Sequence, residues 1–138
     1  MTTLIVDTGP LVALVDRSER AHEWTRARFA EVRPPVHTCE PVLAEAVYLL
    51  RSARVDADPV LDLVARGVLA VSFDLAAEVD SVRALMRRYA PRMDLADACL
   101  VRMSEQRPAA PILTLDSDFR VYRRNGRAVI PVRMPLRG

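Results

Sequence analysis

The sequence contains no lysine, and all 20 of its basic residues are arginine. This absence excludes a phosphate-binding loop of the Walker A type, which needs a lysine. It also excludes lysine Schiff bases and the lysine–glutamate pair of protein kinases, and it disfavours a phosphoacceptor receiver domain, which normally needs a lysine. Arginine, a rigid and permanently charged fork, remains available to bind phosphate. A genome rich in arginine codons explains the absence equally well, so it serves only to exclude.

Cysteine and long apolar runs are also scarce. Cys39 and Cys99 lie far apart in the sequence without a CxxC motif, and only two histidines accompany them. We therefore expect two buried, reduced thiols rather than a zinc site. The apolar start of the chain is interrupted by Asp7, and no run approaches the ~18 apolar residues of a membrane span. The expected protein has no signal peptide and is soluble and cytoplasmic.

The composition is that of a globular protein, with 138 residues of which 51% are hydrophobic and 28% charged. This length predicts a single domain over residues 1–138. The net charge of +2 is unevenly distributed, because residues 119–138 carry six arginines and no acid. An acidic body suits a site built from carboxylates, and a basic end suits a partner that carries phosphates. A solvated C-terminal tail is an equally good interpretation of the basic end.

Apolar runs alternate with segments of helical periodicity along the whole chain. The expected strands span residues 4–6, 36–38, 68–73, 112–115 and 129–132. The first expected helix begins with residues 11–15. The other expected helices span residues 19–32, 42–53, 56–66, 75–89 and 94–105. Thr8 or Gly9 is expected to cap the first helix, and Asp74 the fifth. Strands separated by helices, without tight hairpins, predict a parallel α/β sheet with helices on both faces, whose ligands bind beyond the carboxyl ends of the strands.

Four acids stand in apolar surroundings. Asp7 and Asp116 each follow an expected strand directly, so the architecture places both at the ligand-binding edge. Glu45 and Asp97 lie in expected helices among apolar neighbours. Burying an unpaired carboxylate costs several kcal/mol, so such acids need a partner or a metal ion. Converging carboxylates select Mg²⁺ or Mn²⁺, which promote phosphodiester hydrolysis by water without a protein nucleophile.

Each acid also has a simpler interpretation. Asp7 fits a helix cap or a turn, and Glu45 fits a solvent-exposed position or an ion pair with a nearby arginine. Asp94 and Asp97 have the three-residue spacing of a capping box with Asp94 at the cap. Asp116 fits a turn. Taken together, however, acids at two strand ends and at a helix start predict one common site.

Four segments carry a family resemblance: LIVDTGPLVAL at 4–14, VLAEAVYLL at 42–50, MDLADACLV at 93–101 and TLDSDF at 114–119. In this order, they resemble a PIN-domain ribonuclease, and more narrowly a VapC-type toxin of a type II toxin–antitoxin pair. The resemblance covers nearly the whole chain and implies a five-stranded Rossmann-like parallel sheet. It also implies an endoribonuclease that uses Mg²⁺ or Mn²⁺, a cognate antitoxin and a homodimer.

The resemblance assigns roles position by position. The catalytic and metal-binding acids that it implies are Asp7, Glu45, Asp97 and Asp116, with Asp94 as a second candidate for the third position. Thr8, Thr114 and Asp118 match positions that orient water or neighbouring carboxylates.

Arg120, Arg123 and Arg124 around Tyr122 resemble an RNA-facing patch, although solvated surface is the commoner outcome of such a run. The alternative functions are a PIN-like module that binds RNA or protein without cutting, a phosphoacceptor receiver, and a nuclease for DNA flaps.

Overall fold

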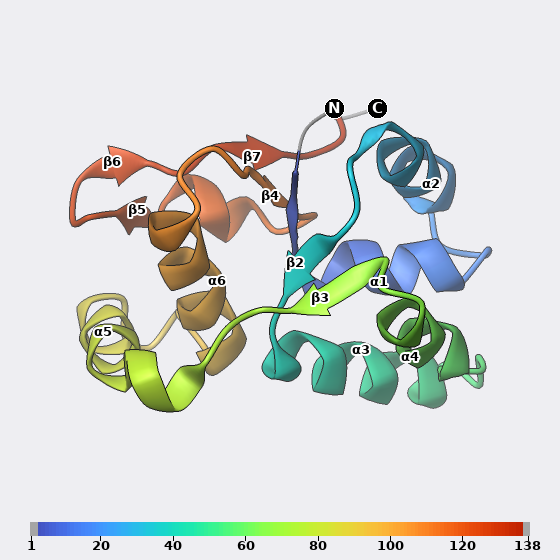
Figure 1. Cartoon of the computed structure of the whole chain (residues 1–138), viewed down its shortest axis with the longest axis horizontal. Coiled ribbons are helices and arrows are strands. Elements are labelled where there is room, and N and C mark those ends of the chain that lie inside the picture. The colour runs from blue at the N-terminus through green and yellow to red at the C-terminus, as the bar shows by residue number, and fades with distance from the viewer. Residues whose placement is uncertain (1–2, 137–138) are drawn as a thin grey trace.

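Five short parallel strands form the central sheet, and the first strand of the chain lies in its middle (Figure 1). The computed structural model describes residues 3–136. The strands follow the order β3–β2–β1–β4–β7, and each is parallel to its neighbours. Their bounds are Ile5–Val6 for β1, Val36–Thr38 for β2, Leu69–Val71 for β3, Ile112–Leu113 for β4 and Val132–Arg133 for β7. The predicted five-stranded parallel sheet is confirmed.

The direction in which the chain builds the sheet reverses between β1 and β4. From β1 the chain adds β2 and β3 on one side, then returns to add β4 and β7 on the other. The connections that leave two such neighbouring strands diverge toward opposite faces, which opens a crevice at their carboxyl ends. Asp7 follows β1 immediately, and Asp116 lies three residues beyond β4. Both acids therefore stand at the crevice.

Helices cover both faces of the sheet, as expected (Figure 1). On one side lie α1, α2 and α4, and on the other lie α5 and α6. The helix α3 packs against both α1 and α6. The helical bounds are Thr8–Val15 for α1, His22–Glu31 for α2, Glu40–Ser52 for α3, Asp58–Ala65 for α4, Leu75–Arg88 for α5 and Leu95–Gln106 for α6.

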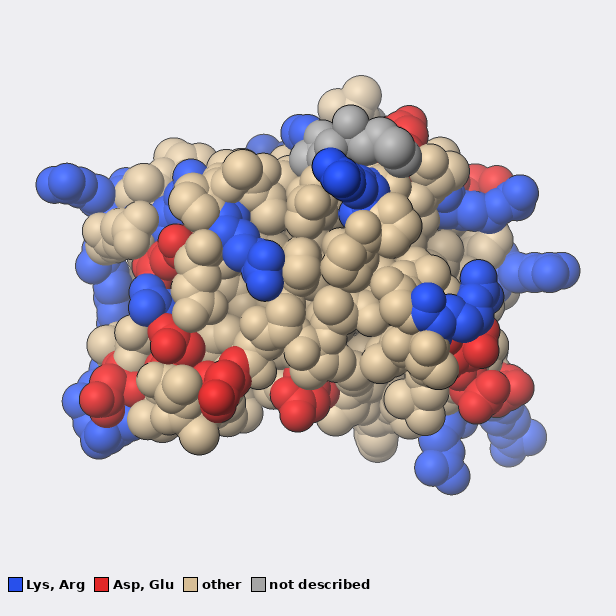
Figure 2. Space-filling model, viewed as in Figure 1, with Lys and Arg blue, Asp and Glu red and all other residues tan. Residues whose placement is uncertain are grey.

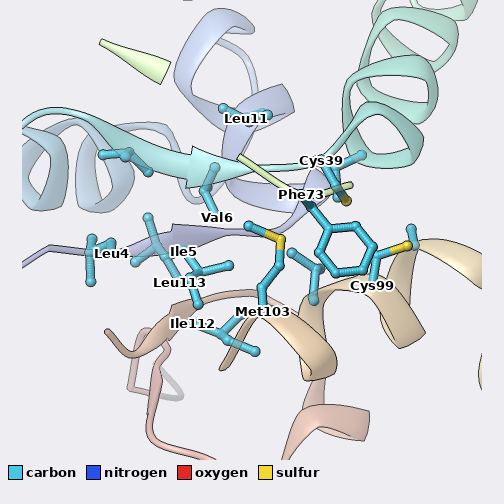
Figure 3. Close-up of a cluster of buried hydrophobic side chains, with 14 of the residues drawn as sticks. Leu4, Ile5, Val6, Leu11, Cys39, Phe73, Cys99, Met103, Ile112 and Leu113 are labelled. Carbon is cyan, nitrogen blue, oxygen red and sulfur yellow. The ribbon is translucent and has the colours of Figure 1, made fainter. Parts of the chain in front are cut away.

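The buried core surrounds the central strands (Figure 3). Ile5 and Val6 of β1 are fully buried because this strand has a strand on each side and helices on both faces. Continuous apolar runs are typical of strands in that position. Cys39 and Cys99 are free and buried within the same cluster, which confirms the expectation of two buried thiols.

Acidic side chains cap three of the helices, α1, α5 and α6. Asp74 and Asp94 accept hydrogen bonds from backbone N–H groups three residues later and so cap α5 and α6, which satisfies donors that a helix start leaves unpaired. The predicted cap of α1 is wrong. Asp7, not Thr8 or Gly9, is the N-cap, because its extended backbone and its carboxylate meet the N–H of Thr8.

The C-terminal part differs from the expected single strand over residues 129–132. β6 (Ala128–Val129) instead forms an antiparallel hairpin with β5 (Arg123–Arg124), and only Val132–Arg133 joins the main sheet. Asn125 and Gly126 both adopt positive φ, at 53° and 79°, as a tight hairpin turn requires. The expected absence of tight hairpins is therefore wrong, because Asn125-Gly126 favours a tight turn at this point of the chain.

The surface of the described residues shows two general features. Within residues 3–136, no helix combines the length and the apolar character needed to cross a membrane. Figure 2 shows one face of the molecule, on which charged side chains gather around the rim while the middle is mostly uncharged.

Candidate active site

A cavity of about 540 Å³ lies at the carboxyl ends of β1 and β4. Its walls come from the start of α1, the middle of α3, the start of α6 and the segment after β4. The acids that line it are Asp7, Glu45, Asp94, Asp97, Asp116 and Asp118. Arg92 is the one basic residue among its described lining residues. The fold thus brings together every acid that the sequence singled out.

Asp7 lies at the floor of the crevice, and its side chain is buried. One carboxylate oxygen accepts the N–H of Thr8 at 2.7 Å, and the other accepts the hydroxyl of Thr114 at 2.7 Å. Burial raises the pKa of Asp7 to about 6, an effect larger than the opposing hydrogen bonds from the two threonines. The negative charges of Asp116 and Glu45 raise this pKa further.

Thr114 joins the two strand ends that carry acids. Its hydroxyl donates to Asp7 and accepts the backbone N–H of Asp116 at 2.9 Å. Thr114 is fully buried, so this hydroxyl has both of its hydrogen bonds inside the protein. The position of the Asp7 carboxylate is therefore fixed by a residue that lies 107 positions later in the chain.

Asp97 is the second buried acid, at 8% exposure on the first turn of α6. Burial raises its pKa to about 7, although the hydroxyl of Tyr122 donates to its Oδ2 at 2.8 Å and lowers the pKa. The negative charges of Asp94, Asp7 and Asp116 raise the pKa further. Two carboxylates whose pKa values are raised by burial thus share one cavity, a pattern found where charged groups perform a function.

The other acids lie at the rim of the cavity. Glu45 is exposed on α3, and Asp94 is exposed with one oxygen accepting the N–H of Asp97. Asp116 accepts the N–H of Asp118 at the start of a short 3₁₀ helix, Ser117–Arg120. The Oδ1 of Asp118 lies 3.9 Å from the Nε of Arg92. Asp94, and Asp7 as well, thus combine a capping role with a place in the cavity.

A protein-family model supplies the classification. The model of the PIN domain matches residues 4–125, which include the cavity acids. The chain belongs to the PIN domain family.

A solved structure shows the same fold as this PIN domain. The crystal structure of VapC20 from Mycobacterium tuberculosis, a toxin that cleaves the sarcin–ricin loop, superposes with a TM-score of 0.72. The match covers 94% of this chain and 100% of that chain at 22% sequence identity. A comparison with curated proteins gives no match. The likeness therefore establishes the fold of this PIN domain.

Tyr122 is a site residue that the sequence interpretation misplaced. Its ring is fully buried, with edge-on contacts to Tyr89 and Phe119 at centroid distances of 5.1 and 5.3 Å. It cannot face RNA from this position, and it holds the carboxylate of Asp97 instead. The local sequence carries no signal for this role, because Arg120, Arg123 and Arg124 stand on either side of Tyr122.

The neighbouring arginines differ from one another. Arg120 is exposed. Arg123 donates to backbone carbonyls of residues 120–122, and Arg124 donates to the carbonyls of Ser104 and Pro108. The guanidinium groups of Arg123 and Arg124 thus bind the protein's own backbone. Their contact with RNA stays a prediction.

The cavity suits a hydrated divalent cation. Within residues 3–136, no three His, Cys, Asp or Glu side chains are already arranged as a metal-binding group. Mg²⁺ nevertheless commonly binds through one or two carboxylates and keeps several waters, and Asp7 and Asp97 offer two such groups. The buried Oγ1 of Thr8, at the edge of the same cavity, has no hydrogen-bond partner in the described structure. A hydrated cation would relieve both the carboxylate repulsion and this unpaired hydroxyl.

Proposed function

We propose that this PIN domain is a metal-dependent endoribonuclease and the toxin of a type II toxin–antitoxin pair. The observation that carries the proposal is the pair of buried carboxylates, Asp7 and Asp97, brought together from two distant segments at the crevice of the sheet. A protein gains no stability from two such charges without a cation. The placement is therefore best explained by a function that needs them.

The acids Asp7, Glu45, Asp97 and Asp116 would hold Mg²⁺ or Mn²⁺, with Asp94 as a further candidate. When bound, such an ion lowers the pKa of a coordinated water and neutralises charge that develops on a phosphate. Thr114 fixes the orientation of Asp7, and Tyr122 fixes that of Asp97. Carboxylates held in this way need little rearrangement before they act.

The histidines do not contribute a base to this cavity. His22 binds the carbonyl of Ala13 at 2.7 Å, and His37 binds the hydroxyl of Ser72 at 2.8 Å. Neither histidine is among the residues that line the cavity. The proposed reaction is accordingly the attack of water on an RNA phosphodiester, with the carboxylates as the principal ionisable groups.

RNA as the substrate is supported by the similarity to VapC20, whose structure is described as that of a toxin cleaving the sarcin–ricin loop. Six acids and one arginine at the cavity would repel a phosphate, so a cation is needed before RNA can approach. This requirement links the proposed substrate to the proposed cofactor.

The decisive test is RNA cleavage by the purified protein with Mn²⁺ and with EDTA. We expect cleavage only with Mn²⁺, and a loss of about 100-fold or more in Asp7→Asn and Asp97→Asn, because each removes a charged ligand. Asp80→Asn is the matched control, since Asp80 is an exposed acid away from the cavity. Equal cleavage by all variants, with or without EDTA, would contradict the metal-dependent nuclease, and RNA binding without any cleavage would favour a module that binds without cutting.

The proposed partners are a cognate antitoxin and a second copy of the chain. Tyr48 and Leu49 on α3 are 69% and 41% exposed, and Leu49 also lines the acid cavity. Apolar side chains of this size at the edge of a site are typical of contact surfaces. We propose a cytoplasmic homodimer that uses this face. Light scattering after size exclusion would measure it, and Tyr48→Ser is expected to shift the mass toward the monomer.

A further inference from the structure

A second and larger cavity, of about 1080 Å³, adjoins the acid cavity. Leu115 lines both cavities and so forms part of the wall between them. The other walls come from the start of α2, with Trp24, and from the segment after β7, with Met134 and Pro135. We call this second cavity the Trp24 groove.

The Trp24 groove has the opposite charge to the acid cavity. Arg20, Arg28 and Arg133 line it, against one acid, Glu19. Arg20 and Arg133 are exposed, and neither forms an ion pair with another residue of the described chain. Arg28 pairs with Glu31 at 2.9 Å, outside the groove lining. The groove is therefore a positive surface directly beside a negative one.

Besides positive charge, a surface that binds nucleic acid needs groups on which bases can stack, and the groove contains an aromatic ring. The guanidinium carbon of Arg28 lies over the ring of Trp24, 5.5 Å from its centroid. Unstacked bases bind by stacking on aromatic rings and on guanidinium planes, and these two groups offer both. A purely apolar partner would leave the charges of Arg20 and Arg133 without compensation.

The pairing of β7 with β4 fixes the position of the Trp24 groove relative to the acid cavity. Arg133 stands beside Leu113 in the parallel ladder, and its carbonyl accepts the N–H of Thr114 at 3.1 Å. Thr114 is the residue that binds the Asp7 carboxylate. A phosphate held by Arg133 would thus lie beside β4, the strand that leads to Thr114 and Asp116.

We propose that the Trp24 groove binds the single-stranded RNA that adjoins the scissile phosphate, with a base on Trp24 and Arg28 and phosphates on Arg20 and Arg133. This inference rests on the proposed function, since it takes RNA as the substrate. The acid cavity repels phosphates, and the groove supplies the attraction that positions the strand next to it.

Trp24 is the only tryptophan of the chain, so its fluorescence reports on the groove alone. Titration of the full chain in EDTA with a short single-stranded oligoadenylate measures binding without cleavage. We expect quenching of Trp24 emission, and about tenfold weaker binding by the double variant Arg20→Gln/Arg133→Gln. Its logarithmic salt dependence should fall by about 1.4, for two lost phosphate contacts.

The matched control is the double variant Arg51→Gln/Arg87→Gln, which changes the net charge equally at two exposed arginines outside the groove. Trp24→Leu, whose folding is checked by thermal melting, should weaken binding about fivefold or more, measured by anisotropy of a labelled oligonucleotide. Equal binding by both double variants would overturn the proposal. RNA binding with unchanged Trp24 emission would also overturn it and would leave the groove to a protein partner.

Cleavage with Mn²⁺ separates this proposal from the proposed function. A wild-type protein that cleaves RNA, with groove variants that match the control, retains the nuclease and removes the groove. A protein that never cleaves, but binds oligoadenylate through Arg20, Arg133 and Trp24, retains the groove and removes the nuclease.

Discussion

Asp97 and Asp7 are buried more deeply than their charges favour. Each has hydrogen-bond donors, yet burial still raises both pKa values above the ordinary 3.8, to about 7 and about 6. The unfolded chain ionises these groups at lower pH than the folded chain does. For each group, the free energy of unfolding therefore falls as the pH rises from the pKa of the unfolded chain to the higher pKa of the folded chain. The two acids therefore lower the free energy of unfolding at neutral and high pH, and the packing of the rest of the fold offsets this loss.

Asp97→Asn should therefore stabilise the metal-free protein at high pH. The variant removes a carboxyl group whose ionisation lowers the free energy of unfolding between about pH 4 and pH 7. Asparagine can still accept a hydrogen bond from the hydroxyl of Tyr122. In EDTA at pH 8 we expect a gain of roughly 2 to 4 kcal/mol in the free energy of unfolding, and little difference near pH 3. Urea denaturation at several pH values measures it. A gain that is the same at every pH would contradict the electrostatic cause.

Tyr122→Phe removes one hydroxyl and keeps the ring that packs between Tyr89 and Phe119. We expect the Mn²⁺ concentration for half-maximal cleavage to rise about tenfold, because Asp97 loses the donor that orients it. Tyr89→Phe is the control. The Tyr89 hydroxyl accepts the N–H of Arg123 and does not contact an acid. If both variants lose activity equally, with an unchanged Mn²⁺ requirement, Tyr122 has only a packing role.

The β5–β6 hairpin braces the helix that carries Asp97. Arg124 donates to the carbonyls of Ser104 and Pro108 at the end of α6, and the N–H of Asn125 donates to Glu105 at 2.6 Å. Arg88 of α5 donates to the carbonyl of Gly126 at 2.8 Å. The hairpin thus ties both helices of one face to the segment that supplies Tyr122.

Gly126→Ala tests the hairpin turn. Alanine at φ +79° is strained, although its Cβ would meet nothing closer than 3.5 Å, so we expect a loss of about 1 kcal/mol in the free energy of unfolding. Gly67→Ala, at φ +76° with open space around it, should cost about the same. Only Gly126→Ala should speed amide hydrogen exchange over residues 123–129. Equal exchange in both variants would show that the turn does not hold the hairpin.

Periodicity predicted the main elements, because each buried strand is an apolar run and most helices start at a capping acid or an early proline. It failed where two very short strands stand next to each other. Val129 and Val132 read as one strand, yet Pro131 between them lacks an N–H and the Asn-Gly turn draws Ala128–Val129 into the hairpin. The sequence predicted that the acids converge. It could not predict the Tyr122 bond to Asp97, since that contact depends on how the hairpin folds over α6.

Across the whole molecule, the acidic cavity should make stability depend on divalent cations. A ligand that binds only the folded state stabilises it by about 2.7 kcal/mol at a hundredfold excess over its Kd. For a chain of this size we expect a rise of about 5 to 10 °C in Tm with saturating Mn²⁺. Asp7→Asn should abolish the rise. A similar rise with NaCl of equal ionic strength would show that the effect is general screening.

The strand order also governs when the site can exist during synthesis. β1 is made before the other strands of the sheet but occupies its middle, and one of its two neighbours is β4, which is made after β2 and β3. The carboxylate of Asp7 lacks its hydrogen bond from Thr114, and that of Asp97 its hydrogen bond from Tyr122, until these later residues have been made. A nascent chain therefore carries its acids without an assembled cavity. A chain that cuts RNA therefore cannot do so before the segments that carry Thr114 and Tyr122 have been made and have folded onto the rest of the sheet.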